Sequence, residues 1–197
     1  MRAATLTHID RNGQQGNAEN QTAKQLEALF DECFAKQFNT QLVGGAEEPF
    51  YRATHEGNPA EIHFSHDYFR SALHEIAHWC VAGDDRRQRD DYGYWYAPDG
   101  RDAEQQREFE KVEVMPQAWE LLFCAASAHP FRVSMDNLDN SPSDVSHFEK
   151  AVFEQAKKLL RTVPRGRGWQ WVQMLALHYR RTAGFQREWI GQVFTAW

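Results

Sequence analysis

The sequence predicts a helix-rich α+β fold, arranged as a single domain with a small sheet. The chain has 197 residues, enough for one sizeable core and too few to expect two. Several segments repeat apolar residues at helical spacing, whereas the segments that resemble strands are few and short, the first two near residues 40–43 and 62–65. We therefore expect a flexible polar tail over residues 1–21 and one folded domain, which carries any catalytic site, over residues 22–197.

Helical spacing of apolar residues predicts an amphipathic helix over residues 22–38. A loop rich in Gly, Pro and Glu then separates the two extended segments. A second helix is expected over residues 67–82. Asp67 can act as its N-cap, and Gly83 offers a left-handed residue to stop it.

The second half of the chain is predicted to be mostly helical. A long helix over residues 102–128 contains Pro116, which should bend or divide it. The apolar piece FRVSM (131–135) follows a His-Pro pair and predicts a short strand. The remaining predicted helices lie near residues 144–161, 169–180 and 186–195.

The composition argues against two classes of protein. A formal charge of -6 and a pI near 5.8 disfavour a dedicated nucleic-acid binder, which would carry a basic excess. The longest nearly apolar stretch, residues 121–128, is too short to cross a bilayer, and the N-terminal residues lack the apolar segment of a secretory signal. The three cysteines form no CxxC pair and are expected to be buried thiols in a reducing compartment. We therefore expect a cytoplasmic protein without nucleic-acid or membrane partners.

The motif that carries chemistry is HEIAH, residues 74–78. On a helix, positions i and i+4 share a face, so the imidazoles of His74 and His78 can bind one metal ion. Glu75 is rotated by about 100° from His74 and lies beside the metal, where a metallopeptidase keeps its general base. The alternative is a pair of histidines that form hydrogen bonds at a helix surface.

A third ligand is expected from the helix over residues 102–128. Projection of that helix places Phe109, Val112, Pro116, Trp119 and Phe123 on its apolar side, and Glu110 nearly opposite. Glu113 falls at the margin of the buried side, where a carboxylate is costly unless it is paired or bound to a metal. Glu113 is therefore the predicted third ligand, and Glu120, close to the same line two turns later, is the second choice. The alternative for Glu113 is a carboxylate at the rim of the buried side, in a salt bridge.

Two histidines and one carboxylate leave coordination positions open on the metal. Such a site suits zinc with a bound water, as in peptidases, and also Fe(II), which binds dioxygen. The spacing alone does not choose between the two metals. The extended motif HExxHxxGxxH is excluded, because the chain has Val81 and Asp84 where that motif needs glycine and histidine.

The segment DYGYWYAPDGRD (91–102) is the densest aromatic and charged cluster of the chain. Tyr94, Trp95 and Tyr96 are candidates to line a substrate cleft, and Asp99 or Asp102 to receive a cationic group. The alternative is an aromatic strand that packs on the core and ends in a turn.

Longer blocks of sequence carry a resemblance to a known family. HEIAHWCVAG (74–83), DYGYWYAPDGRDAEQQREFEKVEVMPQA (91–118) and LLFCAA (121–126) together resemble the bacterial elongation factor P hydroxylase family. CFAKQFNTQLVGG (33–45) and FRVSMDNL (131–138) extend the resemblance with less force. Most of the chain from about residue 24 is covered. The tail and the last forty residues depart from the family's pattern, which puts the docking surface for a partner in doubt rather than the metal site.

The resemblance implies a non-haem iron monooxygenase whose protein partner and substrate is elongation factor P. The implied reaction hydroxylates a lysine of the factor after β-lysine has been attached to it, and places the oxygen on the factor's own lysine. Fe(II) is the implied cofactor, with dioxygen as co-substrate; zinc or another divalent metal can be present in the purified protein. The family's metal-binding residues match His74, His78 and Glu113. The implied fold looks like that of HExxH metallopeptidases rather than a jelly-roll barrel.

Two other functions fit the motif. The first is a zinc metallopeptidase with Glu75 as the general base, and the second is a binding module with a structural metal. The second predicts a saturated coordination sphere, against which the count of three ligands argues. In a hydroxylase Glu75 has no water to activate; it would orient ligands or take part in proton transfer.

Overall fold

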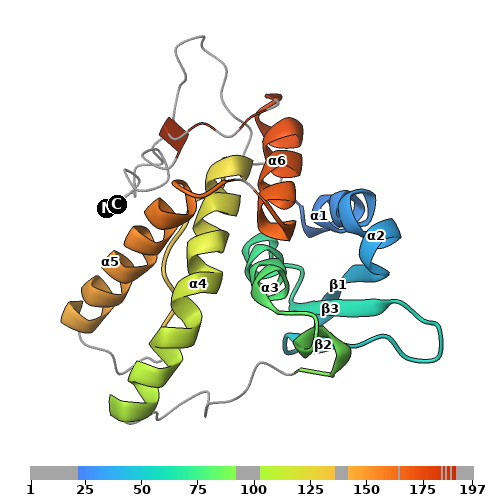
Figure 1. Cartoon of the computed structure of the whole chain (residues 1–197), viewed down its shortest axis with the longest axis horizontal. Helices are drawn as coiled ribbons and strands as arrows, with labels where there is room; N and C mark the ends of the chain where they lie inside the picture. Colours follow the sequence, from blue (N-terminus) through green and yellow to red (C-terminus); the bar gives the residue numbers. More distant parts are fainter. Residues whose placement is uncertain are drawn as a thin grey trace, which may run out of the picture.

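The computed structural model describes residues 22–91, 103–135, 142–163, 165–182, 184, 186, 188 and 189. Over these residues the chain is helix-rich with a small sheet, which confirms the predicted fold class (Figure 1). Helices α3 (Phe69–Val81) and α4 (Ala103–Ser127) pack against each other in the middle of the molecule. The sheet packs on α3, and α5 (Pro142–Leu159) packs on α4 (Figure 1). The predicted tail over residues 1–21 lies outside the described residues.

The first predicted helix is present and contains an unpredicted π-helical turn. Thr22 begins it with a capping box: the Thr22 side chain accepts from the Gln25 backbone N–H, and the Gln25 side chain accepts from the Thr22 backbone N–H. The segments are α1 (Ala23–Phe30), the π-helical turn (Asp31–Ala35) and α2 (Lys36–Phe38).

The sheet has three strands in the order β1-β3-β2 within the described residues. The two predicted strands are confirmed and pair in parallel, while an unpredicted third strand pairs antiparallel to β3. The third strand was missed because it is only three residues long and lies in a loop-like stretch. The register of β1 shifts between Val43 and Ala46, where Gly45 has a φ of +80°, a conformation that suits glycine. The strands are β1 (Thr40–Ala46), β2 (Phe50–Arg52) and β3 (Ala60–Ser65).

Helix α3, which carries the HEIAH motif, follows β3 and lies within two residues of the predicted bounds at each end, but neither predicted capping residue ends it. His66 and Asp67 are left-handed, with φ of 54° and 53°, and so form the turn out of β3. The N-cap is Tyr68, which makes no side-chain capping hydrogen bond. Ala82 ends the helix with φ -59° and ψ 126°, and Gly83 has no positive φ.

Helix α4 continues through Pro116, so of the two effects predicted for this proline, a bend or a division, the division is wrong. Proline removes the hydrogen bond to the carbonyl four residues earlier, here that of Val112. Val112 is 51% exposed, so this turn of α4 lies at the surface. The same exposure corrects the helix projection, which had placed Val112 on the buried side.

The segment 131–135 is not the predicted strand, and no strand pairs with it among the described residues. Phe131 and Met135 are buried. Between them, the Arg132 carbonyl accepts a hydrogen bond from a side chain of α3, and the carbonyl and N–H of Ser134 bond a side chain of α4. Helices α5 and α6 (Arg167–Tyr179) confirm the next two predicted helices. The last predicted helix, near 186–195, lies mostly outside the described residues.

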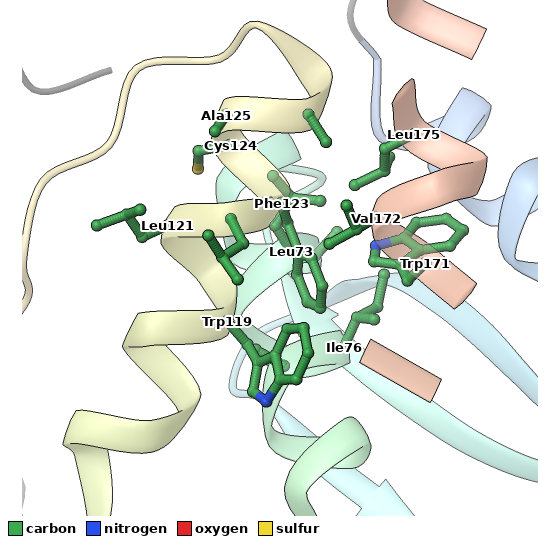
Figure 2. Packing of buried hydrophobic residues seen from close by; sticks show 14 of the residues in the cluster. Leu73, Ile76, Trp119, Leu121, Phe123, Cys124, Ala125, Trp171, Val172 and Leu175 are labelled. Carbon is green, nitrogen blue, oxygen red and sulfur yellow. The ribbon is translucent and has the colours of Figure 1, made fainter. Parts of the chain in front are cut away.

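The hydrophobic core lies where α3, α4 and α6 meet, as the converging side chains in Figure 2 show. Leu73 of α3, Phe123 of α4 and Trp171 of α6 are each 0% exposed. Helix α6 approaches α4 closely because Gly168 has no side chain; a Cβ there would lie 2.8 Å from the ring of Trp119. The tryptophans of α6 therefore pack in the core.

Two expectations from composition concern the thiols and the membrane. All three cysteines are free thiols; Cys124 is buried, while Cys33 and Cys80 are partly buried. Among the described helices, none combines the length and the apolar character that crossing a bilayer requires.

Candidate metal centre

Two helices bring the three predicted ligands together. His74 and His78 lie one turn apart on α3, and Glu113 faces them from α4. His78 Nε2 lies 3.0 Å from His74 Nε2 and 3.2 Å from Glu113 Oε1. His74 Nε2 lies 3.7 Å from Glu113 Oε2. One ligand atom from each residue lies within 4.8 Å of the others.

Glu113 is a buried anion, with 7% of its surface exposed. Burial alone would raise the pKa of its carboxyl group. The charges of His78 and His74 and a hydrogen bond from Gln117 outweigh burial and lower the pKa of Glu113 to about 2. Glu113 is therefore deprotonated over the whole physiological pH range, as a metal ligand must be.

Glu120, the second choice for the third ligand, instead contacts Nδ1 of His74, the ring nitrogen that faces away from Glu113 and His78. Its Oε2 lies 2.8 Å from His74 Nδ1, and its Oε1 accepts from Arg70 Nε at 2.7 Å. Burial would raise the pKa of Glu120, but the contacts with His74 and Arg70 lower it. A carboxylate can only accept, so Nδ1 of His74 carries a proton and donates it, which leaves Nε2 to face Glu113 and His78.

The acidic side chains around His74 favour its protonated, cationic form, in which both ring nitrogens carry a proton. Burial alone would lower the pKa of His74, but the hydrogen bond to Glu120 and the charges of Glu120, Glu113 and Glu75 raise it to about 10. The proton that titrates is on Nε2, because Glu120 keeps the one on Nδ1. A metal ion bound at Nε2 takes the place of that proton.

The donor set and its spacing fit a divalent metal ion. Ligand atoms about 2.1 Å from one ion are about 3.0 Å apart at right angles and about 3.4 Å apart at tetrahedral angles. The separations of 3.0, 3.2 and 3.7 Å between His78, His74 and Glu113 are close to these values. Two imidazoles and one carboxylate suit zinc or Fe(II) equally by donor type.

Glu75 lies among the same charges but plays no part in the ligand cluster. Its side chain is partly buried, and burial raises the pKa of its carboxyl group while His74 and His78 act in the opposite direction. Within the described residues, its carboxyl group makes no hydrogen bond or ion pair. Glu75 therefore has a carboxyl group available to a proton or a ligand beside the two histidines.

Sequence reasoning missed two residues of the site, Arg70 and Gln117. Arg70 precedes His74 by four residues, and Gln117 follows Glu113 by four residues, so each shares a helix face with a predicted ligand. This four-residue spacing from a predicted ligand is the sequence feature that could have identified both residues. The predicted cleft residues Tyr94, Trp95 and Tyr96 lie outside the described residues, as do Asp99 and Asp102.

Comparison with known proteins identifies the family. A sequence model of the family described as elongation factor P hydroxylase matches residues 29–188. This chain belongs to the elongation factor P hydroxylase family. A relative from Haemophilus influenzae named elongation factor P lysine hydroxylase is 49% identical over 131 residues, which cover 66% of this chain and 74% of the relative. The resemblance noted in the sequence blocks is confirmed.

Metal uptake by this member of the elongation factor P hydroxylase family is expected to release about one proton per ion at neutral pH. The reason is that His74, with its pKa raised to about 10, is protonated there and must lose a proton to bind metal. Calorimetric titration with Co(II) in buffers of different ionisation enthalpy measures the release. Binding heats that do not depend on the buffer would show that His74 is not a ligand.

Proposed function

We propose that this protein hydroxylates the β-lysylated lysine of translation elongation factor P. Fe(II) bound by His74, His78 and Glu113 is the proposed cofactor, and dioxygen the proposed co-substrate. One oxygen atom enters the lysine and the other leaves as water, so each turnover also consumes two electrons and two protons, and the electrons come from an external reductant. The observation that supports this most is the convergence of these three donors in a member of the elongation factor P hydroxylase family. The relative from Haemophilus influenzae is named as a lysine hydroxylase of the same factor.

Each residue of the site has a proposed role in binding the metal ion or in orienting one of its ligands. Bound Fe(II) with three protein ligands offers open coordination positions for dioxygen and supplies the oxidising chemistry. His74 and His78 bind through Nε2, while Glu120 fixes the ring of His74 from the other side. Glu113 adds a negative charge that partly neutralises the cation. These side chains are presented by two packed helices, so the site is largely formed before substrate arrives.

Glu75 is the proposed catalytic side chain, with a role in proton transfer. Burial raises the pKa of its carboxyl group, which favours a side chain that takes up a proton and passes it on. The same position supports the second candidate function, a zinc metallopeptidase, in which Glu75 deprotonates a bound water. The two functions differ in metal, in co-substrate and in whether a peptide bond is cut.

The test is to incubate the purified, iron-loaded protein with β-lysylated elongation factor P under air, with a reductant in excess over the factor, and to measure the intact mass of the factor. A gain of one oxygen atom is expected, and Glu75→Gln should reduce the rate while metal content stays unchanged. Full hydroxylation by Glu75→Gln would remove the catalytic role of that residue. An unchanged factor, together with peptide cleavage by the zinc-loaded protein that Glu75→Gln abolishes, would establish the peptidase instead.

A further inference from the structure

Residues 131–135, the segment that sequence reasoning expected to be a strand, lie against the side chains that hold two of the proposed ligands. Two contacts reach its backbone from the site, one at Arg132 and one at Ser134. The segment belongs to no strand of the described sheet. Its hydrogen bonds to side chains therefore need an explanation of their own.

The contact at Ser134 fixes the amide of Gln117, a side chain that is 0% exposed. The Ser134 N–H donates to Gln117 Oε1 at 3.0 Å, and Gln117 Nε2 donates to the Ser134 carbonyl at 2.7 Å. Because a backbone N–H only donates, the amide has one possible orientation. Its Nε2 then also donates to Glu113 Oε2 at 3.3 Å. Ser134 thus aims Gln117 at the proposed carboxylate ligand.

The contact at Arg132 fixes Arg70, which in turn bonds Glu120, the carboxylate partner of His74. The guanidinium of Arg70 donates to the Arg132 carbonyl through Nη2 and to Glu120 Oε1 through Nε, and it lies 5.5 Å from the centre of the Phe131 ring. Glu120, which is 1% exposed, accepts in turn from His74 Nδ1. Arg70 thus connects the segment to the proposed histidine ligand through one carboxylate.

The geometry points to residues 131–135 as a brace, with Gln117 and Arg70 as positioning residues that set Glu113 and His74 from one shared piece of backbone. This inference rests on the metal site of the proposed function. The two anchor carbonyls, at positions 132 and 134, are two residues apart in one short piece of backbone. A movement of the segment would therefore disturb both ligands at once, through Gln117 and through Arg70 with Glu120.

The test measures Co(II), a spectroscopic substitute for Fe(II), and uses no enzymatic activity. Gln117→Met removes the amide at similar volume, and Arg70→Lys keeps the charge but loses the fork that joins Glu120 to Arg132. Each variant is expected to bind Co(II) about 10- to 100-fold more weakly, with a changed visible spectrum, because supporting partners of metal ligands have effects of that size. Gln170→Met, on the exposed side of α6, is the matched control and should bind as the wild type does.

The double variant separates a shared brace from two independent supports. If the segment positions both ligands, loss of one contact already loosens the other, and Gln117→Met with Arg70→Lys loses less affinity than the product of the single losses. Losses that multiply would overturn the brace, as would single variants that bind Co(II) as the wild type does with an unchanged spectrum. A wild-type protein that binds no Co(II) would overturn the proposed function together with the brace.

Discussion

His78→Ala is expected to lose both metal binding and hydroxylation of elongation factor P. The variant removes the donor that lies 3.0 Å from His74 Nε2 and 3.2 Å from Glu113 Oε1. Affinity should fall by more than about 100-fold, since loss of a mere supporting partner already costs 10- to 100-fold. Competition with a metal chelator measures this loss, and the intact mass of the factor measures hydroxylation.

The matched control is His147→Ala, which changes an exposed histidine on α5. That variant should bind metal and hydroxylate as the wild type does. Added metal should also raise the thermal midpoint of the wild type and the control, but not that of His78→Ala. Stoichiometric metal in His78→Ala, held with wild-type affinity, would place the metal elsewhere in the chain.

Arg167→Met is expected to destabilise the folded protein by about 2–4 kcal/mol, because a charged donor to several carbonyls is lost at a helix end. The Nη2 group of Arg167 donates to the carbonyls of Trp79, Cys80 and Ala82 at 2.9, 3.3 and 2.5 Å, which closes the C-terminus of α3. The guanidinium also lies 4.6 Å from the centre of the Trp79 ring. Urea unfolding of the full chain measures the change in the free energy of unfolding.

Arg165→Met is the control for Arg167→Met, since Arg165 is an exposed arginine two residues earlier. Its free energy of unfolding should stay within about 0.5 kcal/mol of the wild-type value, as is usual for surface substitutions. Methionine keeps most of the apolar stem of arginine, so the difference between the two variants isolates the guanidinium. Equal stability of both variants would show that α3 does not depend on Arg167 for its end.

Local periodicity accounts for what the sequence predicted well. The helices came from the spacing of apolar residues, and the pairing of His74 with His78 follows from helical geometry alone. Glu113 could be selected because a carboxylate at the margin of a buried helix side calls for a partner, and the structure gives it two histidines. These inferences need only one helix at a time.

Features that depend on contacts between distant segments were missed. The Arg70–Glu120 pair and the Gln117–Ser134 contacts join residues 50 and 17 positions apart, and no periodicity within one helix reports such contacts. Residues 131–135 have the composition of a strand, but their backbone groups bond side chains of the site instead. Asp67 has the chemistry of an N-cap, but the turn out of β3 holds it in a left-handed conformation.

The central claim is that this protein is an oxygenase that acts on elongation factor P through the site of His74, His78 and Glu113. Its most direct test is a reaction of the iron-loaded protein with β-lysylated elongation factor P under isotopically labelled dioxygen and with an added reductant, followed by mass spectrometry of the intact factor and of its modified peptide. We expect the factor to gain one labelled oxygen atom, on its own lysine. A factor that gains no oxygen, or gains only unlabelled oxygen from water, would contradict the claim.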